Sequence, residues 1–239
     1  MGLLDDLKQQ ADSVLVQKRT SAQDRTQKLQ ASDARMKTAL QYWVDFFKAL
    51  NVVKPQIARN YYVEGSTQLA NLVQTDYNVN SRRLSVEHHD YIDSIELRFR
   101  CVSNQSVTIE KDSDILVNRL REHLWTHGLK FEVREIRKEG AYVERGIFTI
   151  AGEVVVRLTI TADAEDSRIT LTVRNLERLG EYSYTYDFDE FGTEMLEEIG
   201  KAILAQPHKL RALGKRQAQG AGAWSGPERR AVDADKSGA

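Results

Sequence analysis

The sequence predicts an α+β protein: an antiparallel sheet of about five to seven strands with two packed helices, preceded by a long N-terminal helical arm and followed by a disordered tail. Two observations support this. Apolar and polar residues alternate in several segments of the middle of the chain, which is typical of strands with one buried face. Glycine is absent between Gly2 and Gly65 and then recurs at intervals suited to turns, and none of the three prolines, at 55, 207 and 227, interrupts this middle part.

These signals divide the chain into a helical arm at residues 1–58, an α+β domain at 59–205 and a tail at 206–239. The arm carries two apolar stripes at helical spacing. The first comprises Leu3, Leu4, Leu7, Ala11, Val14 and Leu15, and the second comprises Met36, Leu40, Trp43, Phe47 and Leu50. They predict two amphipathic helices, or one long helix with a polar middle, ending near Pro55. Both stripes could instead pack on the domain or form a coiled coil.

Strands are predicted in the domain wherever apolar and polar residues alternate. The segments are SIELRFRC at 94–101, FEVREI at 131–136, YVERGIFTI at 142–150, VVVRLTIT at 154–161 and RITLTVR at 168–174. Short polar loops between consecutive strands favour antiparallel pairing. A last strand places Tyr182, Tyr184, Tyr186 and Phe188 on one face. We interpret that face as core, because the segment carries acids and lacks the basic residues that accompany base-stacking surfaces.

Two helices are predicted within the domain. KDSDILVNRLREHLWTHG, at 111–128, is expected to be capped by Ser113 and to stop at Gly128. GTEMLEEIGKAIL, at 192–204, has one apolar face and follows acids that favour a helix N-terminus. Helices placed in this way among antiparallel strands resemble in outline the secretion-chaperone class of α+β folds. The resemblance implies a fold and no function.

Composition and charge limit the classes of function. Apolar residues make up 41% of the chain, the single Cys101 cannot form a disulfide within it, and no apolar run is long enough to span a bilayer, so we expect a soluble, cytoplasmic protein. The arm has nine Lys/Arg and six Asp/Glu, the tail seven and three, and the domain the remaining 18 and 26, which gives net charges of +3, +4 and −8. The acidic domain disfavours nucleic acid as its partner, whereas the basic ends attract anionic surfaces.

Arginines occupy polar positions of three predicted strands. Arg98, Arg100, Arg157 and Arg174 alternate with the buried set, together with several threonines. If these strands are neighbours, the arginines form a cationic patch that binds an anionic ligand or RNA. The alternative is cross-strand pairing with Glu96 and other acids, which requires no ligand.

His123 and His127 lie four residues apart on the first predicted helix, a spacing at which two imidazoles reach one metal ion. Packing and capping of the helix end are the alternative roles. The segment EHHD, at 87–90, is interpreted as a surface loop. No glutamate follows His123 as a general base, and neither a nucleotide-binding loop nor a nucleophile motif is present. We therefore expect no cofactor and no enzymatic activity.

The expected function is a non-enzymatic protein-binding or adaptor role, in which the arm and the basic tail engage a protein partner or a second copy of the chain. The expected contact residues are Met36, Leu40, Trp43 and Phe47 of the arm and Trp224 of the tail. Two alternatives stay open. One is a binder of an anionic small ligand or RNA through the arginine-lined face, and the other is a metal-dependent enzyme that uses His123 and His127.

Overall fold

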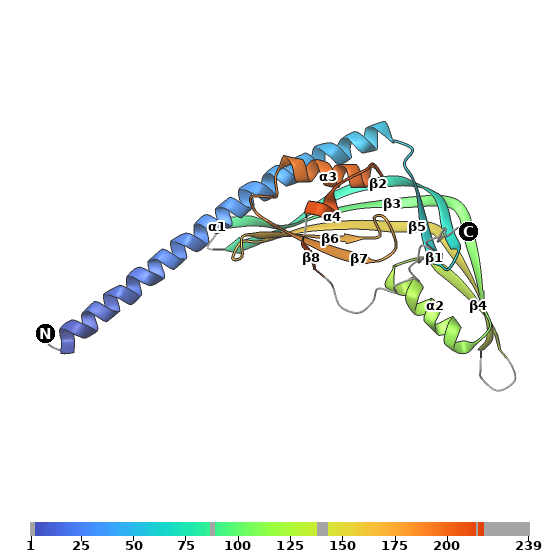
Figure 1. Ribbon diagram of the computed structural model, residues 1–239, viewed down its shortest axis with the longest axis horizontal. Coiled ribbons are helices and arrows are strands. Elements are labelled where there is room, and N and C mark those ends of the chain that lie inside the picture. The colour runs from blue at the N-terminus through green and yellow to red at the C-terminus, as the bar shows by residue number, and fades with distance from the viewer. Residues whose placement is uncertain (1–2, 87–88, 138–142, 214, 218–239) are drawn as a thin grey trace, which may run out of the picture.

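The computed structural model describes residues 3–86, 89–137, 143–213 and 215–217. One helix, α1, runs from Leu3 to Val53, which confirms the long-helix alternative. Its first part projects beyond the rest of the molecule, and its C-terminal part lies along the sheet (Figure 1). Most of the predicted tail lies outside the described residues. Its described part contains a short helix, α4 (Leu210–Leu213), and a short strand, β8 (Lys215–Gln217).

The strands form one antiparallel sheet, so the predicted α+β class is confirmed. The strands before β8 are β1 (Ala58–Glu64), β2 (Thr67–Val86), β3 (His89–Lys111), β4 (Phe131–Arg137), β5 (Val143–Asp163), β6 (Arg168–Arg174) and β7 (Glu181–Asp187). Their order is β1-β2-β3-β5-β6-β7-β8, and β4 pairs with the first part of β5. The predicted helices are α2 (Asp114–Thr126) and α3 (Thr193–Ile203).

Strands β1 and β2 were not predicted because their residues do not alternate regularly. Asn71 and Asp76 of β2 have φ angles of 55° and 57°, and the pairing of β2 with β3 shifts between Thr75 and Asn78. Each irregularity changes which side chains face the core. The buried residues of β2 therefore do not fall at every second position, and the pattern that reveals a strand is lost.

Strand β5 is continuous over 21 residues, where the sequence predicts two separate strands. Gly152 lies in its middle, opposite a bulge in β3 between Val102 and Ser106. A Cβ atom at Gly152 would lie 2.3 Å from the carbonyl oxygen of Gln105, so this close approach of two backbones requires glycine. The glycine that suggested a turn thus marks a close contact between two long strands.

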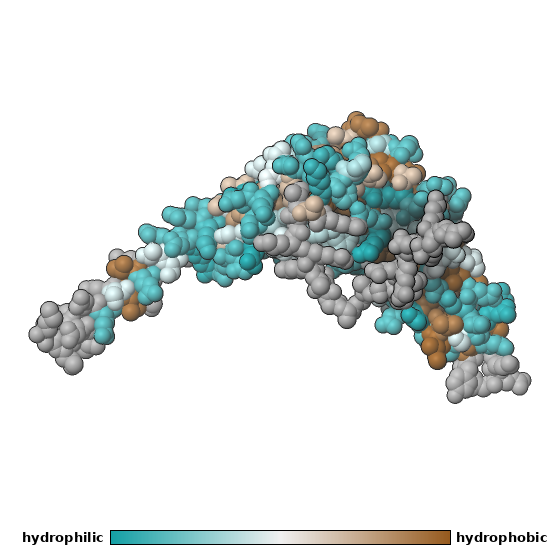
Figure 2. Space-filling model, in the orientation of Figure 1, coloured by the Kyte–Doolittle hydropathy of each residue, from teal (hydrophilic) through white to brown (hydrophobic). Residues whose placement is uncertain are grey.

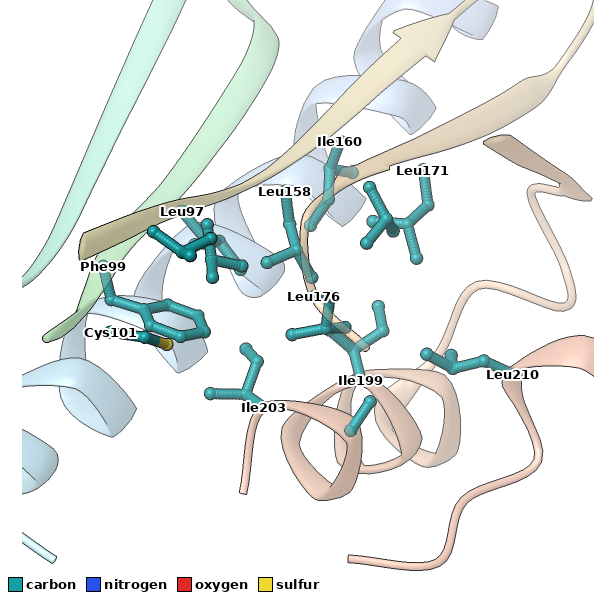
Figure 3. Close-up of a cluster of buried hydrophobic side chains, with 14 of the residues drawn as sticks. Leu97, Phe99, Cys101, Leu158, Ile160, Leu171, Leu176, Ile199, Ile203 and Leu210 are labelled. Carbon is teal, nitrogen blue, oxygen red and sulfur yellow. The ribbon is translucent and has the colours of Figure 1, made fainter. Parts of the chain in front are cut away.

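The apolar face of the sheet is covered by two groups of helices. Over one half, α1 and α3 bury Met36, Trp43, Phe47, Ile199 and Ile203 against β3, β5 and β6. Figure 3 shows part of this core, in which Ile199 and Ile203 of α3 meet side chains of the sheet, among them Leu97, Phe99, Cys101, Leu158, Ile160 and Leu171. Over the other half, α2 buries Val117, Leu120 and Leu124. Each such side chain contributes about 1.5–3 kcal/mol of apolar burial.

The tyrosines of β7 belong to this core. Tyr184, Tyr186 and Phe188 are buried, and Tyr182 is partly buried against the same cluster. Burial raises the pKa of Tyr186 above its usual value, which keeps the phenol neutral. The interpretation of this strand as core is confirmed.

A buried arginine joins α3 to the sheet. Arg59 of β1 is 9% exposed and donates hydrogen bonds to the carbonyl oxygens of Leu176 at 2.7 Å, Ala202 at 2.6 Å and Ile203 at 2.9 Å. The last two carbonyls belong to the C-terminal turn of α3, where the helix dipole favours a cation. Arg59 therefore holds the end of α3 against β1.

Candidate functional site

Three of the four predicted arginines form one row on the polar face of the sheet, opposite the face that the helices cover. Arg98 of β3 is directly opposite Arg157 of β5, and Arg157 is directly opposite Arg174 of β6. We call these three residues the arginine row. Because adjacent strands lie ~4.8 Å apart, the backbones that carry the outer two arginines of the row are only ~10 Å apart. The alternation in sequence predicted the shared face, and the register supplies the direct opposition.

The chain neutralises only part of the charge of the row. Arg98 is exposed, and its side chain forms no hydrogen bond or ion pair with another described residue. The Nε atom of Arg157 lies 3.3 Å from Oε2 of Glu96, but its N–H is buried and not aligned for a hydrogen bond. Arg174 donates to the carbonyl oxygen of Thr126 at 2.6 Å, at the C-terminus of α2. Among the described side chains, Glu96 is therefore the one carboxylate within ion-pair distance of any of the three arginines, and it lies beside Arg157.

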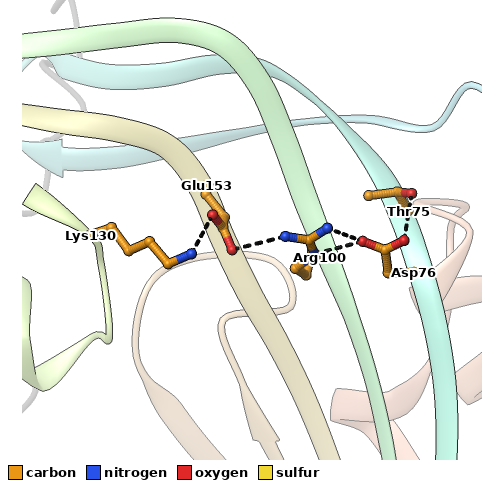
Figure 4. Close-up of polar contacts among 5 residues, drawn as sticks. All are labelled: Thr75, Asp76, Arg100, Lys130 and Glu153. Atoms are coloured by element: carbon orange, nitrogen blue, oxygen red, sulfur yellow. Dashed lines mark hydrogen bonds and ion pairs between the residues drawn. The ribbon is translucent and has the colours of Figure 1, made fainter.

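Arg100, the fourth predicted residue, belongs to a chain of alternating charges. Its Nε donates to Oδ2 of Asp76 at 2.7 Å, and its other side reaches Glu153, which accepts from Nζ of Lys130 at 2.8 Å (Figure 4). The hydrogen bond from Lys130 is the main reason that the pKa of Glu153 lies below its usual value. Arg100 thus follows the cross-strand pairing alternative, and it is not a member of the row.

Hydroxyl groups continue the polar face beside the arginine row. The next two register rows across β5, β6 and β7 comprise Thr159, Thr172 and Ser183, and then Thr161, Thr170 and Thr185. The hydroxyls of Thr172 and Ser183 lie 3.1 Å apart and share a hydrogen bond. Ser183 and the hydroxyl of Thr185 are buried, so the donors of this face that a ligand can reach are the guanidinium groups and the threonine hydroxyls of β5 and β6. Such donors suit a ligand that is rich in acceptor oxygens.

The two predicted metal ligands contact each other on α2 and its C-terminus. The ring centroids of His123 and His127 are 4.5 Å apart. Nε2 of His123 lies 3.0 Å from the carbonyl oxygen of Val63, and because a carbonyl only accepts, this nitrogen carries a proton. Burial, followed by the charges of His123 and Arg174, lowers the pKa of His127 to about 4. The described residues contain no cluster of three or more His, Cys, Asp or Glu side chains that could hold a metal ion.

The predicted contact residues of the arm lie inside the molecule. Met36 and Trp43 are 0% exposed, Phe47 is 2% exposed, and Leu40 is partly buried against the same core. Their own sheet occupies them, as in the docking alternative, so they present no free surface to a partner. Trp224 lies outside the described residues, as do residues 87 and 88 of the EHHD segment.

The projecting part of α1 carries free apolar residues instead. Val14, Leu15 and Val16 are 49%, 52% and 63% exposed. They account for a hydrophobic patch on the projecting helix in Figure 2. We call them the apolar triad. Two of its members belong to the first predicted stripe.

A cavity that the sequence did not predict lies beneath α1, at the end of the sheet where the helix leaves it. Its volume is about 570 Å³, and it lies between α1, the β2–β3 hairpin and the β5–β6 hairpin. Its apolar lining comprises Leu29, Leu84, Val86, Tyr91, Ile92 and Ala162. Arg25 and Lys28 tie the helix to Glu165 of the β5–β6 loop, at 3.5 and 2.9 Å. The one local signal is Leu29, which precedes Met36 by seven residues and so continues the buried stripe.

Comparison with known protein families, with curated proteins and with solved structures gave no match to this chain. Within the described ranges, no helix is both long enough and apolar enough to cross a membrane. The arginine row, the cavity and the apolar triad are therefore the features from which a function can be inferred.

Proposed function

We propose that this protein is a non-enzymatic binding protein whose arginine row binds a small, multiply charged anion. The direct opposition of Arg98, Arg157 and Arg174 is the observation that supports this most strongly. Like charges at directly opposite positions of antiparallel strands destabilise a sheet. A bound anion would convert that repulsion into attraction.

The free donors of the row indicate the chemistry of the ligand. The guanidinium of Arg98 is exposed and has no partner among the described residues, and the side chain of Arg157 is 43% exposed. Arginine binds phosphate and carboxylate oxygens through two parallel hydrogen bonds, and such charge-assisted bonds are the strong ones. A compound with two or more phosphate groups would engage neighbouring arginines at once and would find hydroxyl donors beside them.

The surrounding charge favours a small anion over a polymer. The domain around the row has a net charge of −8, and Asp76 and Glu153 lie on the flanking strands beside Arg100. A long phosphate backbone would extend beyond the row and meet these acids. RNA therefore remains the second ligand class for this face.

Binding of pyrophosphate, of a nucleoside triphosphate and of a single-stranded oligonucleotide tests the proposal. Isothermal titration calorimetry at several salt concentrations should show that pyrophosphate or the triphosphate binds and that salt weakens the binding. The double variant Arg98→Gln/Arg157→Gln should lose at least about tenfold in affinity, because each charge-assisted hydrogen bond contributes ~1.5–3 kcal/mol.

Arg168→Gln is the matched control. Arg168 lies on the same face of the same strand as Arg174, at its other end, and it pairs with Asp166 and Asp187. Its replacement should leave affinity unchanged. Equal affinity of the double variant and the natural chain would refute the proposal, and binding of the oligonucleotide alone would transfer it to RNA.

The protein-binding role is the second candidate, and the apolar triad is the observation that favours it. Exposed apolar residues on a projecting helix are a common means of engaging another helix or groove. A chain that begins at Gln30 keeps every buried residue of α1 and lacks the triad. Loss of self-association or of partner binding in that chain would support the role, and unchanged behaviour would dismiss it.

A further inference from the structure

We infer that two copies of this chain exchange their projecting helices, so that the apolar triad of each copy occupies the cavity beneath α1 of the other. The triad is exposed, and the cavity beneath α1 of the same chain has an apolar lining. Within one chain the two cannot meet, because both Leu15 and Leu29 belong to one continuous helix. Fourteen residues at 1.5 Å each separate them by about 21 Å.

The spacing along α1 allows a closed pair with two-fold symmetry. When two α1 helices lie antiparallel with the symmetry axis beside Ala22, Leu15 of one copy is level with Leu29 of the other. Residues 15, 22, 29 and 36 repeat at intervals of seven, so they lie on one side of the helix. The same surface is then used by both copies, which closes the assembly as a dimer.

A second hollow lies beside the cavity, along the same stretch of α1 near the proposed axis. It measures about 240 Å³ and lies between α1 and the β2–β3 hairpin. Its lining comprises Ser21, Ala22, Arg25, Thr26, Leu29, Val86 and Tyr91. The two hollows share Ser21, Arg25, Leu29, Val86 and Tyr91, so together they form one groove beside residues 21–32 of α1, which an antiparallel helix could occupy.

Charge complementarity identifies a second copy as the occupant. Residues 8–19, which contain the triad, have three bases and one acid, net +2. The lining of the cavity has four acids, Asp24, Asp93, Asp163 and Glu165, and two bases, Arg25 and Lys28, and the neighbouring Arg82 pairs with Asp93, which leaves a net charge of −1. A helix with apolar residues inside a basic segment therefore fits an apolar cavity with a net acidic lining. This inference does not depend on anion binding, because the row lies on the other face of the sheet.

The molar mass of the full chain in solution tests the exchange. Sedimentation equilibrium over a concentration series that extends to ~100 µM should show a dimer. Leu15→Glu in the triad and Leu84→Glu in the cavity should each weaken the dimer at least about 100-fold, because either places a charge in the apolar contact. Both side chains are about half exposed, so neither change should unfold the chain. Val52→Glu, at a 77% exposed position near the other end of α1, is the control and should leave the dimer intact.

Cross-linking supplies a measurement that does not depend on affinity. A chain with Leu15→Cys and a chain with Leu84→Cys, mixed and mildly oxidised, should form a disulfide with each other. Neither variant alone should do so, and the natural Cys101 is buried and should not react.

Three outcomes would overturn the inference. The first is a natural chain that is monomeric throughout the concentration series. If the cavity of that monomer binds a neutral fluorescent dye and Leu84→Glu prevents the binding, the cavity is a site for a small molecule. The second is a dimer that survives both glutamate variants. The third is a dimer that Leu15→Glu breaks and Leu84→Glu preserves, which would indicate a coiled coil of the two helices without use of the cavity.

Discussion

Replacement of Arg98 by threonine is expected to make the protein slightly more stable while it weakens anion binding. Arg98 is directly opposite Arg157 and has no bonding partner among the described residues. The substitution therefore removes a repulsion and breaks no described contact. Threonine already occupies Thr159 and Thr161 on the same face of β5, so the new side chain suits its surroundings.

The size of the gain follows from the separation of the charges. Two unit charges ~6 Å apart in water repel by about 0.7 kcal/mol, and physiological salt, with a screening length of ~8 Å, reduces this to roughly half. Directly opposed like charges in sheets have costs of the same order. We expect the free energy of unfolding to rise by about 0.3–0.7 kcal/mol at low salt, and by less at high salt.

Urea unfolding at low and high salt measures this difference. Arg157→Thr and the double variant complete a cycle. The repulsion between Arg98 and Arg157 is lost in either single variant, so this part of the gain should not add, and the cycle cancels the contacts of Arg157 with Arg174 and Glu96. Arg168→Thr is the control: it breaks ion pairs with Asp166 and Asp187 and should gain nothing. A loss of stability in Arg98→Thr, or a gain that does not shrink as salt rises, would refute the reasoning that the row is an unfavourable arrangement maintained for a ligand.

Three further changes should have distinct effects on stability. Arg59→Met removes three hydrogen bonds and a buried charge, and urea unfolding should show a loss of about 2–4 kcal/mol. The pKa of His127 is lowered from 6.5 to about 4, so between these pH values the unfolded chain binds more protons than the folded one. The free energy of unfolding should therefore fall by about 1–2 kcal/mol as pH falls from 6.5 to 4. His127→Gln should abolish this loss. Gly152→Ala forces a Cβ against backbone oxygens at 2.3 and 2.8 Å and should lower the melting temperature, with a cost of about 2–3 kcal/mol.

Each of these has its own control and contrary result. An Arg59→Met chain as stable as the natural one would mean that the end of α3 does not need the guanidinium. For His127, His89→Gln at an exposed histidine should keep the pH dependence, and an unchanged slope in His127→Gln would exclude that ring as its source. Gly192→Ala is the control for Gly152, since a Cβ there meets nothing within 4 Å.

Regular alternation made much of the sheet predictable. In β6, Ile169, Leu171 and Val173 are all buried at every second position, and β7 follows the same rule with Tyr184 and Tyr186. Alternation fails in β2 because Asn71 and Asp76, with left-handed backbone geometry, reset the phase of the strand. In β1 every second residue is buried, but the buried Arg59 and the exposed Tyr62 hide that pattern in the sequence. The boundary placed within β5 failed for a related reason, since glycine there permits close packing and does not form a turn.

The candidate sites depended on contacts between distant segments, which a local pattern does not encode. The alternation around Arg98 and Arg157 predicted a shared face, but their direct opposition depends on register, which bulges and loops fix. The stripe at Trp43 and Phe47 correctly indicated a helix with one buried side, but it left open whether the domain or a second helix would cover that side. The cavity at Leu29 lies between α1, the β2–β3 hairpin and the β5–β6 hairpin, and no local pattern in any of these segments indicates that they meet.

The unbroken course of β5 has a consequence for how the protein unfolds. One half of β5 contributes to the core covered by α1 and α3, the other half contributes to the core covered by α2, and Gly152 lies between the two halves. No flexible linker separates these halves, so neither can melt while the other keeps its strand in place. Heating should therefore produce one cooperative transition in the calorimeter, with equal calorimetric and van't Hoff enthalpies.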